Sequence, residues 1–216
     1  MSGFFPIILS SPSGGGKTTI AKALLRRRND LGYSVSCTTR QARPDEKEGQ
    51  DYFFVSREVF EKGRANGDFA ESAEVHGNYY GTLRREVERV LESGRHVIMD
   101  IDVQGTRQFV QAYSDAVTVF LIPPDAEILL SRLRGRGTES PETLARRLKS
   151  AVEELRAVDL YSYLVVNHDL DEAVRDVSSI IDAESMRYVR LGEIHSRIGA
   201  MITDLESELA KMNRRV

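Results

Sequence analysis

Uninterrupted apolar runs alternate with amphipathic stretches along most of this chain, a pattern typical of buried strands covered by helices. The predicted strands are 4–9, 96–99, 116–122 and 163–166. The predicted helices are 18–28, 83–92, 103–113, 126–133, about 140–158, and one that begins near Asp169. The alternation predicts an α/β fold, in which helices cover both faces of a parallel sheet and ligands bind at the carboxyl ends of its strands.

Residues 37–82 depart from this alternation. Short strands are predicted at 33–37, 51–55, 69–75 and 78–80. Between them, Ser56 is suited to cap a helix that runs to about Asn66, with Val59 and Phe60 facing inward. Several short strands in one stretch indicate an inserted β-rich subdomain and not another strand–helix unit.

A glycine-rich loop joins the first predicted strand to the first predicted helix. Three glycines precede Lys17 and Thr18, which matches G-x-x-x-x-G-K-S/T except that Ser11 replaces the first glycine. Backbone N–H groups in such a loop cradle phosphates, while the lysine reaches the β- and γ-phosphates and the hydroxyl ligates Mg²⁺. The expected ATP-binding residues in the loop are Ser11, Pro12, Ser13, Gly14, Gly15, Gly16, Lys17, Thr18 and Thr19. An ordinary glycine-rich turn is the alternative, but strand, loop, Lys17, Thr18 and helix all agree.

Composition narrows the class of protein. The 216 residues are 41% hydrophobic, enough for one α/β unit with a substantial core. A net charge of −3 does not favour nucleic acid as a partner. The single cysteine, Cys37, suits a reducing cytoplasm, and we find no long uncharged apolar run that would cross a membrane. We therefore expect a soluble cytoplasmic protein with neither a nucleic-acid nor a membrane partner.

The C-terminal tail carries an apolar repeat. Residues Leu191, Ile198, Leu205 and Met212 recur every seven residues, with Ile194 and Met201 between them. Glu208 interrupts the intermediate row, which argues against a long coiled coil. Two alternatives remain open at this point: the tail packs on the body of its own chain, or it joins two chains in a homodimer.

Further short stretches make the prediction specific. They are Ser36-Cys37-Thr38-Thr39-Arg40, Arg43, Tyr52, Glu71, Asn78-Tyr79-Tyr80-Gly81-Thr82, Asp100-Ile101-Asp102, Gln104-Gly105, Arg136-Gly137-Thr138-Glu139 and Val166-Asn167. In order and spacing, from about residue 7 to residue 185, they resemble the guanylate kinases, and the chain looks like a bacterial-type single-domain enzyme of that family. The resemblance implies a P-loop NTPase-type parallel sheet flanked by helices, with an inserted β-rich GMP-binding subdomain and a helical lid. The implied division is a core of 1–36, 83–130 and 159–190, a GMP-binding subdomain of 37–82, a lid of 131–158 and a tail of 191–216.

The activity that the resemblance implies is phosphoryl transfer from Mg-ATP to GMP, and by the same chemistry to dGMP, in purine nucleotide metabolism. ATP and GMP are then the small-molecule partners, and Mg²⁺ is the cofactor. Lys17, Arg136 and Arg147 are the implied catalytic residues, and Asn167 is the implied adenine contact. Thr18 would ligate Mg²⁺ directly, with Asp100 or Asp102 holding a water on it. The other arginines of the lid, Arg132, Arg134 and Arg146, are interpreted as helix-surface charges.

The acceptor side needs a second phosphate site and a guanine site. Arg40 and Arg43 can fork onto the GMP phosphate. The hydroxyls of Ser36, Tyr52 and Tyr80 could donate the remaining hydrogen bonds. A carboxylate can accept from both N1–H and N2–H of guanine, and Glu71 matches the family position with that role, which can reject adenine by roughly 10⁴–10⁵. The resemblance assigns Thr82 and Asp102 to the remaining base contacts.

Three other functions share some of these sequence features. A non-catalytic guanylate-kinase-like module in a scaffold protein typically has a damaged donor site, whereas Gly14 to Thr18 and the lid arginines are present here. A sugar-phosphate kinase would share the P-loop and sheet, but the set of Arg40, Arg43, Tyr52, Glu71, Tyr80 and Thr82 argues against it. A nucleic-acid-stimulated ATPase is disfavoured by the acidic charge balance.

Overall fold

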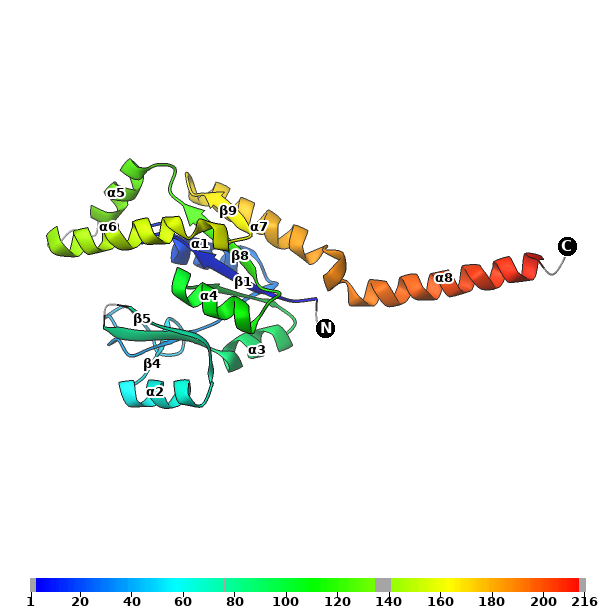
Figure 1. Cartoon of the computed structure of the whole chain (residues 1–216), viewed down its shortest axis with the longest axis horizontal. Helices are drawn as coiled ribbons and strands as arrows, with labels where there is room; N and C mark the ends of the chain where they lie inside the picture. Colours follow the sequence, from blue (N-terminus) through cyan, green and yellow to red (C-terminus); the bar gives the residue numbers. More distant parts are fainter. Residues whose placement is uncertain (1–2, 76, 135–140, 214–216) are drawn as a thin grey trace.

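A computed structural model describes residues 3–75, 77–134 and 141–213 of the chain, and Figure 1 shows its arrangement. The central sheet has five parallel strands in the order β2-β7-β1-β8-β9. Its strands are β1 (Pro6–Ser10), β2 (Leu31–Tyr33), β7 (His96–Asp100), β8 (Val117–Ile122) and β9 (Tyr163–Val166). The α/β prediction is confirmed. Because all five strands point the same way, their carboxyl ends form a single edge where ligands can bind.

Helices cover both faces of this sheet. The helices are α1 (Lys17–Arg27), α3 (Arg84–Glu92), α4 (Val103–Ala112) and α7 (Leu170–Ser185). Successive residues of a strand face opposite sides, so Ile7 packs with α1 and α7, whereas Ile8 packs with α3 and α4. Asp169 caps α7 as predicted, its carboxylate accepting from the N–H groups of Asp171 and Glu172. The sheet is therefore buried on both faces except at its edge strand β9, where Leu164 and Val166 are exposed.

A second sheet lies beside the first, in the order β4-β3-β6-β5. Its strands are β3 (Ser36–Thr38), β4 (Tyr52–Phe54), β5 (Phe69–Val75) and β6 (Asn78–Leu83). Helix α2 (Arg57–Ala65) covers it, capped by the Ser56 hydroxyl as predicted and anchored by Phe60, whose ring stacks on Phe69 and Tyr79. β5 also packs against α4, which fixes the second sheet against the core.

Two predictions in this region were wrong. The strand predicted at 33–37 is two strands, because the chain leaves the central sheet at the end of β2 and enters the second sheet at β3. Ser34 still donates its N–H to Ile98, but Ser34 and Val35 are the crossing point. Val59 is 57% exposed, because α2 buries only the helix face that carries Phe60.

Two further helices follow β8, the fourth strand of the central sheet. Helices α5 (Ala126–Arg134) and α6 (Pro141–Arg156) pack on each other through Leu129, Leu133 and Ala151. Short 3-10 turns, η1 (Val158–Leu160) and η2 (Tyr188–Arg190), precede β9 and α8. Ser140, the predicted cap of α6, lies outside the described residues.

The last helix, α8 (Gly192–Asn213), projects away from the body in Figure 1. Its apolar residues are exposed, with Leu205 63% and Met212 64% accessible. The alternative in which the tail packs on the body of its own chain is therefore wrong for the residues that the structure describes. Within those residues, α8 and the other helices are all too short or too polar to cross a membrane.

Candidate active site

The glycine-rich loop between β1 and α1 has the shape that a phosphate cradle needs. Gly14 and Gly16 have φ angles of 85° and 94°, a left-handed conformation that other residues adopt only with strain. A Cβ on Gly15 would lie 2.6 Å from the Cβ of Ser11, so this position has no room for a side chain. Gly15 N–H donates to the Pro12 carbonyl at 2.8 Å, and α1 begins directly after Gly16. The positive end of α1 therefore points at the loop.

Ser11, the departure from the general pattern, is accommodated. It is 2% exposed, and its hydroxyl donates to the Pro12 carbonyl at 3.0 Å. A serine therefore fits the first position of this loop without an unpaired hydroxyl.

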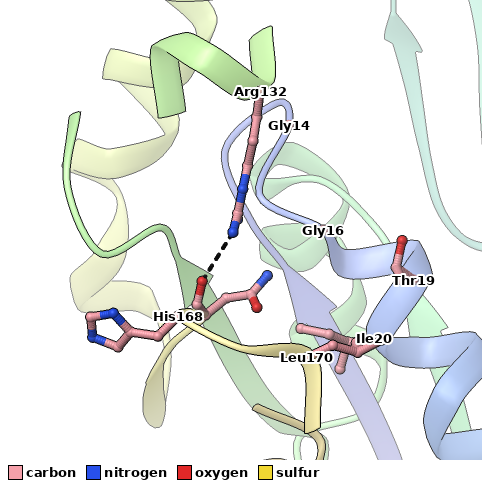
Figure 2. A pocket seen from close by; sticks show the side chains of 8 residues that line it. Gly14, Gly16, Thr19, Ile20, Arg132, His168 and Leu170 are labelled. Atoms are coloured by element: carbon pink, nitrogen blue, oxygen red, sulfur yellow. Dashed lines mark hydrogen bonds between the residues drawn. The ribbon is translucent and has the colours of Figure 1, made fainter. Parts of the chain in front are cut away.

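A pocket of about 490 Å³ opens beside the loop (Figure 2). Asn167, at the carboxyl end of β9, donates its side-chain amide to the Gly15 carbonyl at 2.9 Å. Its own backbone carbonyl accepts from Arg132 at 3.2 Å, and Figure 2 shows the Arg132 side chain reaching from α5 toward it. The pocket is lined by Gly14, Gly16, Thr19, Ile20, Arg132, Asn167, His168 and Leu170.

Arg132 was wrongly interpreted as a surface charge. It is half-buried and lines this pocket, whereas Arg134 and Arg146 are exposed as expected. The helical spacing of these arginines carries no signal that separates them, because which face of α5 turns toward the loop depends on how α5 packs on α6.

Asp100, at the carboxyl end of β7, is held from two sides. Its carboxylate accepts from the Thr18 hydroxyl at 2.5 Å and from the Tyr33 hydroxyl at 2.6 Å. Tyr33 was not singled out from the sequence; it reaches Asp100 because β2 and β7 are neighbours. Burial and the Asp100 charge raise the pKa of Tyr33 well above its ordinary value, so Tyr33 remains a donor. A hydroxyl and a carboxylate side by side form an oxygen donor set of the kind that Mg²⁺ prefers.

A second cavity, of about 480 Å³, joins the loop to the second sheet. It is lined on one side by Ser13 and Lys17 of the loop and on the other by Ser36, Tyr52, Glu71 and Tyr80. Asp100 and Asp102 also line this cavity. The structure thus brings together residues from both predicted halves of the site, although they are far apart in the chain.

Glu71 is the most unusual group in this cavity. It is 5% exposed, and its carboxylate accepts from the Thr82 hydroxyl at 2.7 Å. Burial, aided by the neighbouring Asp102 charge, raises the pKa of Glu71 to about 7. A Cβ on Gly105 would lie 2.6 Å from the second carboxylate oxygen of Glu71, so the glycine leaves that carboxylate its space. Asp102 itself caps α4 by accepting from the Gly105 N–H at 2.7 Å.

The two predicted phosphate-binding arginines are placed differently. Arg40 donates to Glu46 at 2.7 Å and to the Tyr80 hydroxyl at 3.2 Å, with its guanidinium 5.4 Å from the centre of the Tyr52 ring. The hydrogen bond from Arg40 lowers the pKa of Glu46. Arg43 is exposed on the same loop and does not line the cavity. Arg40 is thus adjacent to the cavity, whereas Arg43 would have to swing inward to reach it.

Helix α6 contributes two groups over the loop. Arg147 is 7% exposed and donates to the Leu133 carbonyl at 3.1 Å and to the Ser13 hydroxyl at 3.3 Å. Glu154 accepts from the Ser13 N–H at 3.0 Å, and burial raises its pKa. Glu154 was missed because a glutamate among several on one helix carries no sequence signal. Arg136, the other predicted catalytic arginine, lies outside the described residues.

Comparison with known proteins identifies the family. The guanylate kinase family model matches residues 4–184. The chain belongs to the guanylate kinase family. The guanylate kinase of Symbiobacterium thermophilum is 50% identical over 186 residues, 86% of this chain and 88% of that protein. The guanylate kinase of Nitrosospira multiformis is 43% identical over 91% of this chain and 93% of that protein.

A solved guanylate kinase has the same fold. The crystal structure of guanylate kinase from Anaplasma phagocytophilum matches with a TM-score of 0.72 at 37% identity, covering 88% of this chain and 90% of that one. The family prediction and the fold-class prediction are both confirmed. The match to the family model ends at residue 184, so α8 lies beyond the part of this chain that matches the guanylate kinase family.

Proposed function

We propose that this chain is an ATP:GMP phosphotransferase, which converts ATP and GMP to ADP and GDP and accepts dGMP as well. The observation that carries the proposal is the single cavity lined by Lys17 of the loop and by the buried carboxylate of Glu71. One cavity that holds a phosphate cradle and a buried carboxylate can bind a nucleoside triphosphate and a guanine nucleotide face to face.

Guanine recognition follows from the state of Glu71. One hydroxyl donor, Thr82, leaves the buried carboxylate with spare acceptor capacity. The N1–H and N2–H groups of guanine would supply two donors in one plane. Adenine would present an acceptor at N1, and its binding would leave the carboxylate without that donor, which is costly in a buried site. We infer that Glu71 selects guanine and that Ser36, Tyr52, Tyr80 and Arg40 hold the rest of the acceptor.

Phosphoryl transfer needs positioning and charge neutralisation more than covalent chemistry. The acceptor phosphate oxygen is the nucleophile and is already ionised near neutral pH, so we assign no catalytic base. The loop N–H groups hold the donor phosphates, Lys17 faces the cavity between donor and acceptor, and Arg147 stands over Ser13. These groups would offset the charge that spreads over the transferred phosphoryl group.

Magnesium fits the residues at the end of β7. Thr18 would be the direct ligand, with Asp100 hydrogen-bonded to it and able to hold a water of the ion. Bound Mg²⁺ would neutralise part of the charge on the donor phosphates. Asp102 serves as the cap of α4, which favours Asp100 for the metal role. Among the described residues no three His, Cys, Asp or Glu side chains form a metal cluster, so phosphate and water would complete the shell.

The parts of the chain take different roles in this proposal. Residues 37–82 act as the GMP-binding subdomain and 131–158 as a lid, over the core of 1–36, 83–130 and 159–190. A lid that closes over both nucleotides excludes water, which would otherwise accept the phosphoryl group. We place the reaction in the cytoplasm, where the single thiol, Cys37, would stay reduced, and we propose a homodimer joined through 191–216.

An acceptor panel tests the activity. With Mg-ATP present, ADP release is measured in a coupled assay with GMP, dGMP, AMP and UMP as acceptors. We expect GMP and dGMP to react far faster than AMP or UMP. Equal rates with GMP and AMP would overturn the guanine assignment.

A further inference from the structure

Helix α8 carries a continuous apolar stripe that the described body of the chain leaves uncovered. The arm stripe consists of Ile198, Ile202, Leu205, Leu209 and Met212, which follow one another at spacings of four and three residues. Their side chains are 42%, 51%, 63%, 59% and 64% exposed. Spacings that alternate between four and three place all five on one face of the helix, the geometry of a coiled-coil contact.

This stripe differs from the repeat expected from the sequence. That expectation took Ile194 and Met201 as the intermediate positions, and the row then met Glu208. Moving the intermediate row by one residue places Ile202 and Leu209 in it, with His195 at its start. Glu208 then flanks the contact face and pairs with Lys211 of its own helix at 2.5 Å. The apolar face therefore runs unbroken to Met212.

The intrinsic helix propensity of its residues does not by itself account for the length of α8. It spans 22 residues, and its interior contains Gly199 together with three isoleucines and a threonine, which are weak helix formers. Most helices in proteins are stabilised by packing of an apolar face. α8 lacks such packing against the described body, so a partner that covers the arm stripe would supply it.

Contacts with the body fix the direction in which the chain enters α8. Arg190, immediately before it, donates to Glu184 at 3.1 Å and to the Asp115 carbonyl at 2.9 Å. The same guanidinium lies 4.0 Å from the centre of the Phe5 ring. The rings of Tyr188 and His195 are 3.9 Å apart, which ties the first turn of α8 to η2. These contacts direct the arm stripe outward, toward another molecule.

We propose that the arm stripe binds the arm stripe of a second copy of this chain in an antiparallel, two-stranded coiled coil. The antiparallel register places Ile198 against Leu209 of the partner subunit and Ile202 against Leu205 of the partner subunit. Each of these layers pairs a side chain that branches at Cβ with one that branches at Cγ. The outer layer pairs His195 with Met212 of the partner subunit. The contact is isologous, so it closes with two chains.

A parallel pair fits these residues less well. It would place Ile198 against Ile198 of the partner subunit, at a d position, and Leu209 against Leu209 of the partner subunit, at an a position. In parallel coiled coils, isoleucine at d and leucine at a favour three or more strands. It would also place Glu206 and Glu208, which flank the contact face, at the same level in both chains. In the antiparallel register the segment 204–208 faces residues 199–203 of the partner subunit, none of which is charged. Charge and layer composition therefore favour the same orientation.

The antiparallel dimer leaves the kinase sites apart. Its twofold axis passes between Thr203 and Asp204, roughly 20 Å along the helix from Arg190 at 1.5 Å per residue. In Figure 1 α8 leaves the body on the side away from α5. The two bodies therefore lie at opposite ends of the coiled coil, and turnover in each chain is independent of the contact. The inference rests on α8 alone and does not depend on the proposed reaction.

Disulfide crosslinking tests the orientation. Ile198→Cys and Leu209→Cys are made as single variants of the full chain, with tags of different size, and are oxidised alone and as a mixed, co-expressed pair. We expect a crosslink in the mixed pair and little in either variant alone. Native Cys37 is 4% exposed and present in every sample, so it serves as the internal control. Self-crosslinking of Leu209→Cys without the mixed crosslink would overturn the antiparallel register.

Sedimentation tests the contact itself. We expect the natural chain to sediment as a dimer and Leu205→Asp as a monomer, while Ser196→Asp, on the opposite face of α8, remains a dimer. Guanylate kinase activity per chain should change less than about twofold in both variants, since α8 lies outside the site. A monomeric natural chain, a dimer that persists in Leu205→Asp, or a larger oligomer would each overturn the proposal.

Discussion

The donor and acceptor halves of the proposed site are built in different ways. The donor half is mainly backbone: glycines with positive φ angles, the start of α1 and one lysine. The acceptor half is mainly side chains brought from several strands, with a buried carboxylate at its centre. The triphosphate is the same in all nucleoside triphosphates, so fixed backbone N–H groups are sufficient to bind it. Bases differ in their hydrogen-bond donors and acceptors, so particular side chains are needed to distinguish them.

The largest effect is expected on the donor side. Lys17→Ala removes the cation that we place beside the transferred phosphoryl group, so we expect kcat to fall by about 10³–10⁵, or about 4–7 kcal/mol of transition-state stabilisation. Lys22→Ala is the matched control, because Lys22 lies on the same helix and makes only an exposed ion pair with Asp51. Steady-state kinetics measure both, and thermal unfolding checks that each variant is folded. Turnover of Lys17→Ala close to that of Lys22→Ala would show that the loop is not the donor site.

Substitution of Glu71 should reduce the efficiency with GMP and leave ATP binding unchanged. Glu71→Gln places an amide where guanine presents donors, so we expect kcat/KM for GMP to fall by roughly 30- to 1,000-fold, or about 2–4 kcal/mol. The KM for ATP and the slow rate with AMP should change little. Glu58→Gln, on the exposed face of α2 and outside the lining of the cavity, is the control. If Glu71→Gln loses ATP affinity and keeps GMP affinity, the two halves have been assigned the wrong way round.

The smallest effect is expected on the free energy of unfolding of the ligand-free chain. The pKa of Glu71 is raised to about 7 by burial, so the folded chain holds a proton that the unfolded chain releases at lower pH. The stability linked to this proton is fully present below the ordinary glutamate pKa of about 4.5 and is lost as pH rises through 7, by up to about 3 kcal/mol. Glu71→Gln lacks this titration, so its stability relative to the natural chain should rise between pH 5 and pH 8. Urea unfolding at several pH values measures it, and parallel curves for the two proteins would contradict the buried, protonated state.

Local sequence predicted most elements of the fold, because the loop, the strands and the caps depend on neighbouring residues. Ser56 and Asp169 cap their helices as expected, since a cap needs only an oxygen near the first N–H groups. The prediction of one strand at 33–37 was wrong because β2 and β3 join different sheets. Local apolar character is continuous across these residues, so it gives no sign of the change from one sheet to the other. Arg132 and Tyr33 were misjudged or missed because their partners, Asn167 and Asp100, are distant in the chain.

Residue types and their spacing were sufficient to predict the glycine-rich loop, the alternation of strands and helices, and the family. These features depend on residue type and short spacing, which glycine conformations, apolar periodicity and caps express locally. Three further features depend on how distant segments pack. Glu71 is buried beside Thr82 and Gly105, Asp100 accepts hydrogen bonds from Thr18 and Tyr33, and α8 leaves the body with its apolar face uncovered. Burial, desolvation and pairing across the sheet are properties of segments brought together, so they appear only once the chain is folded.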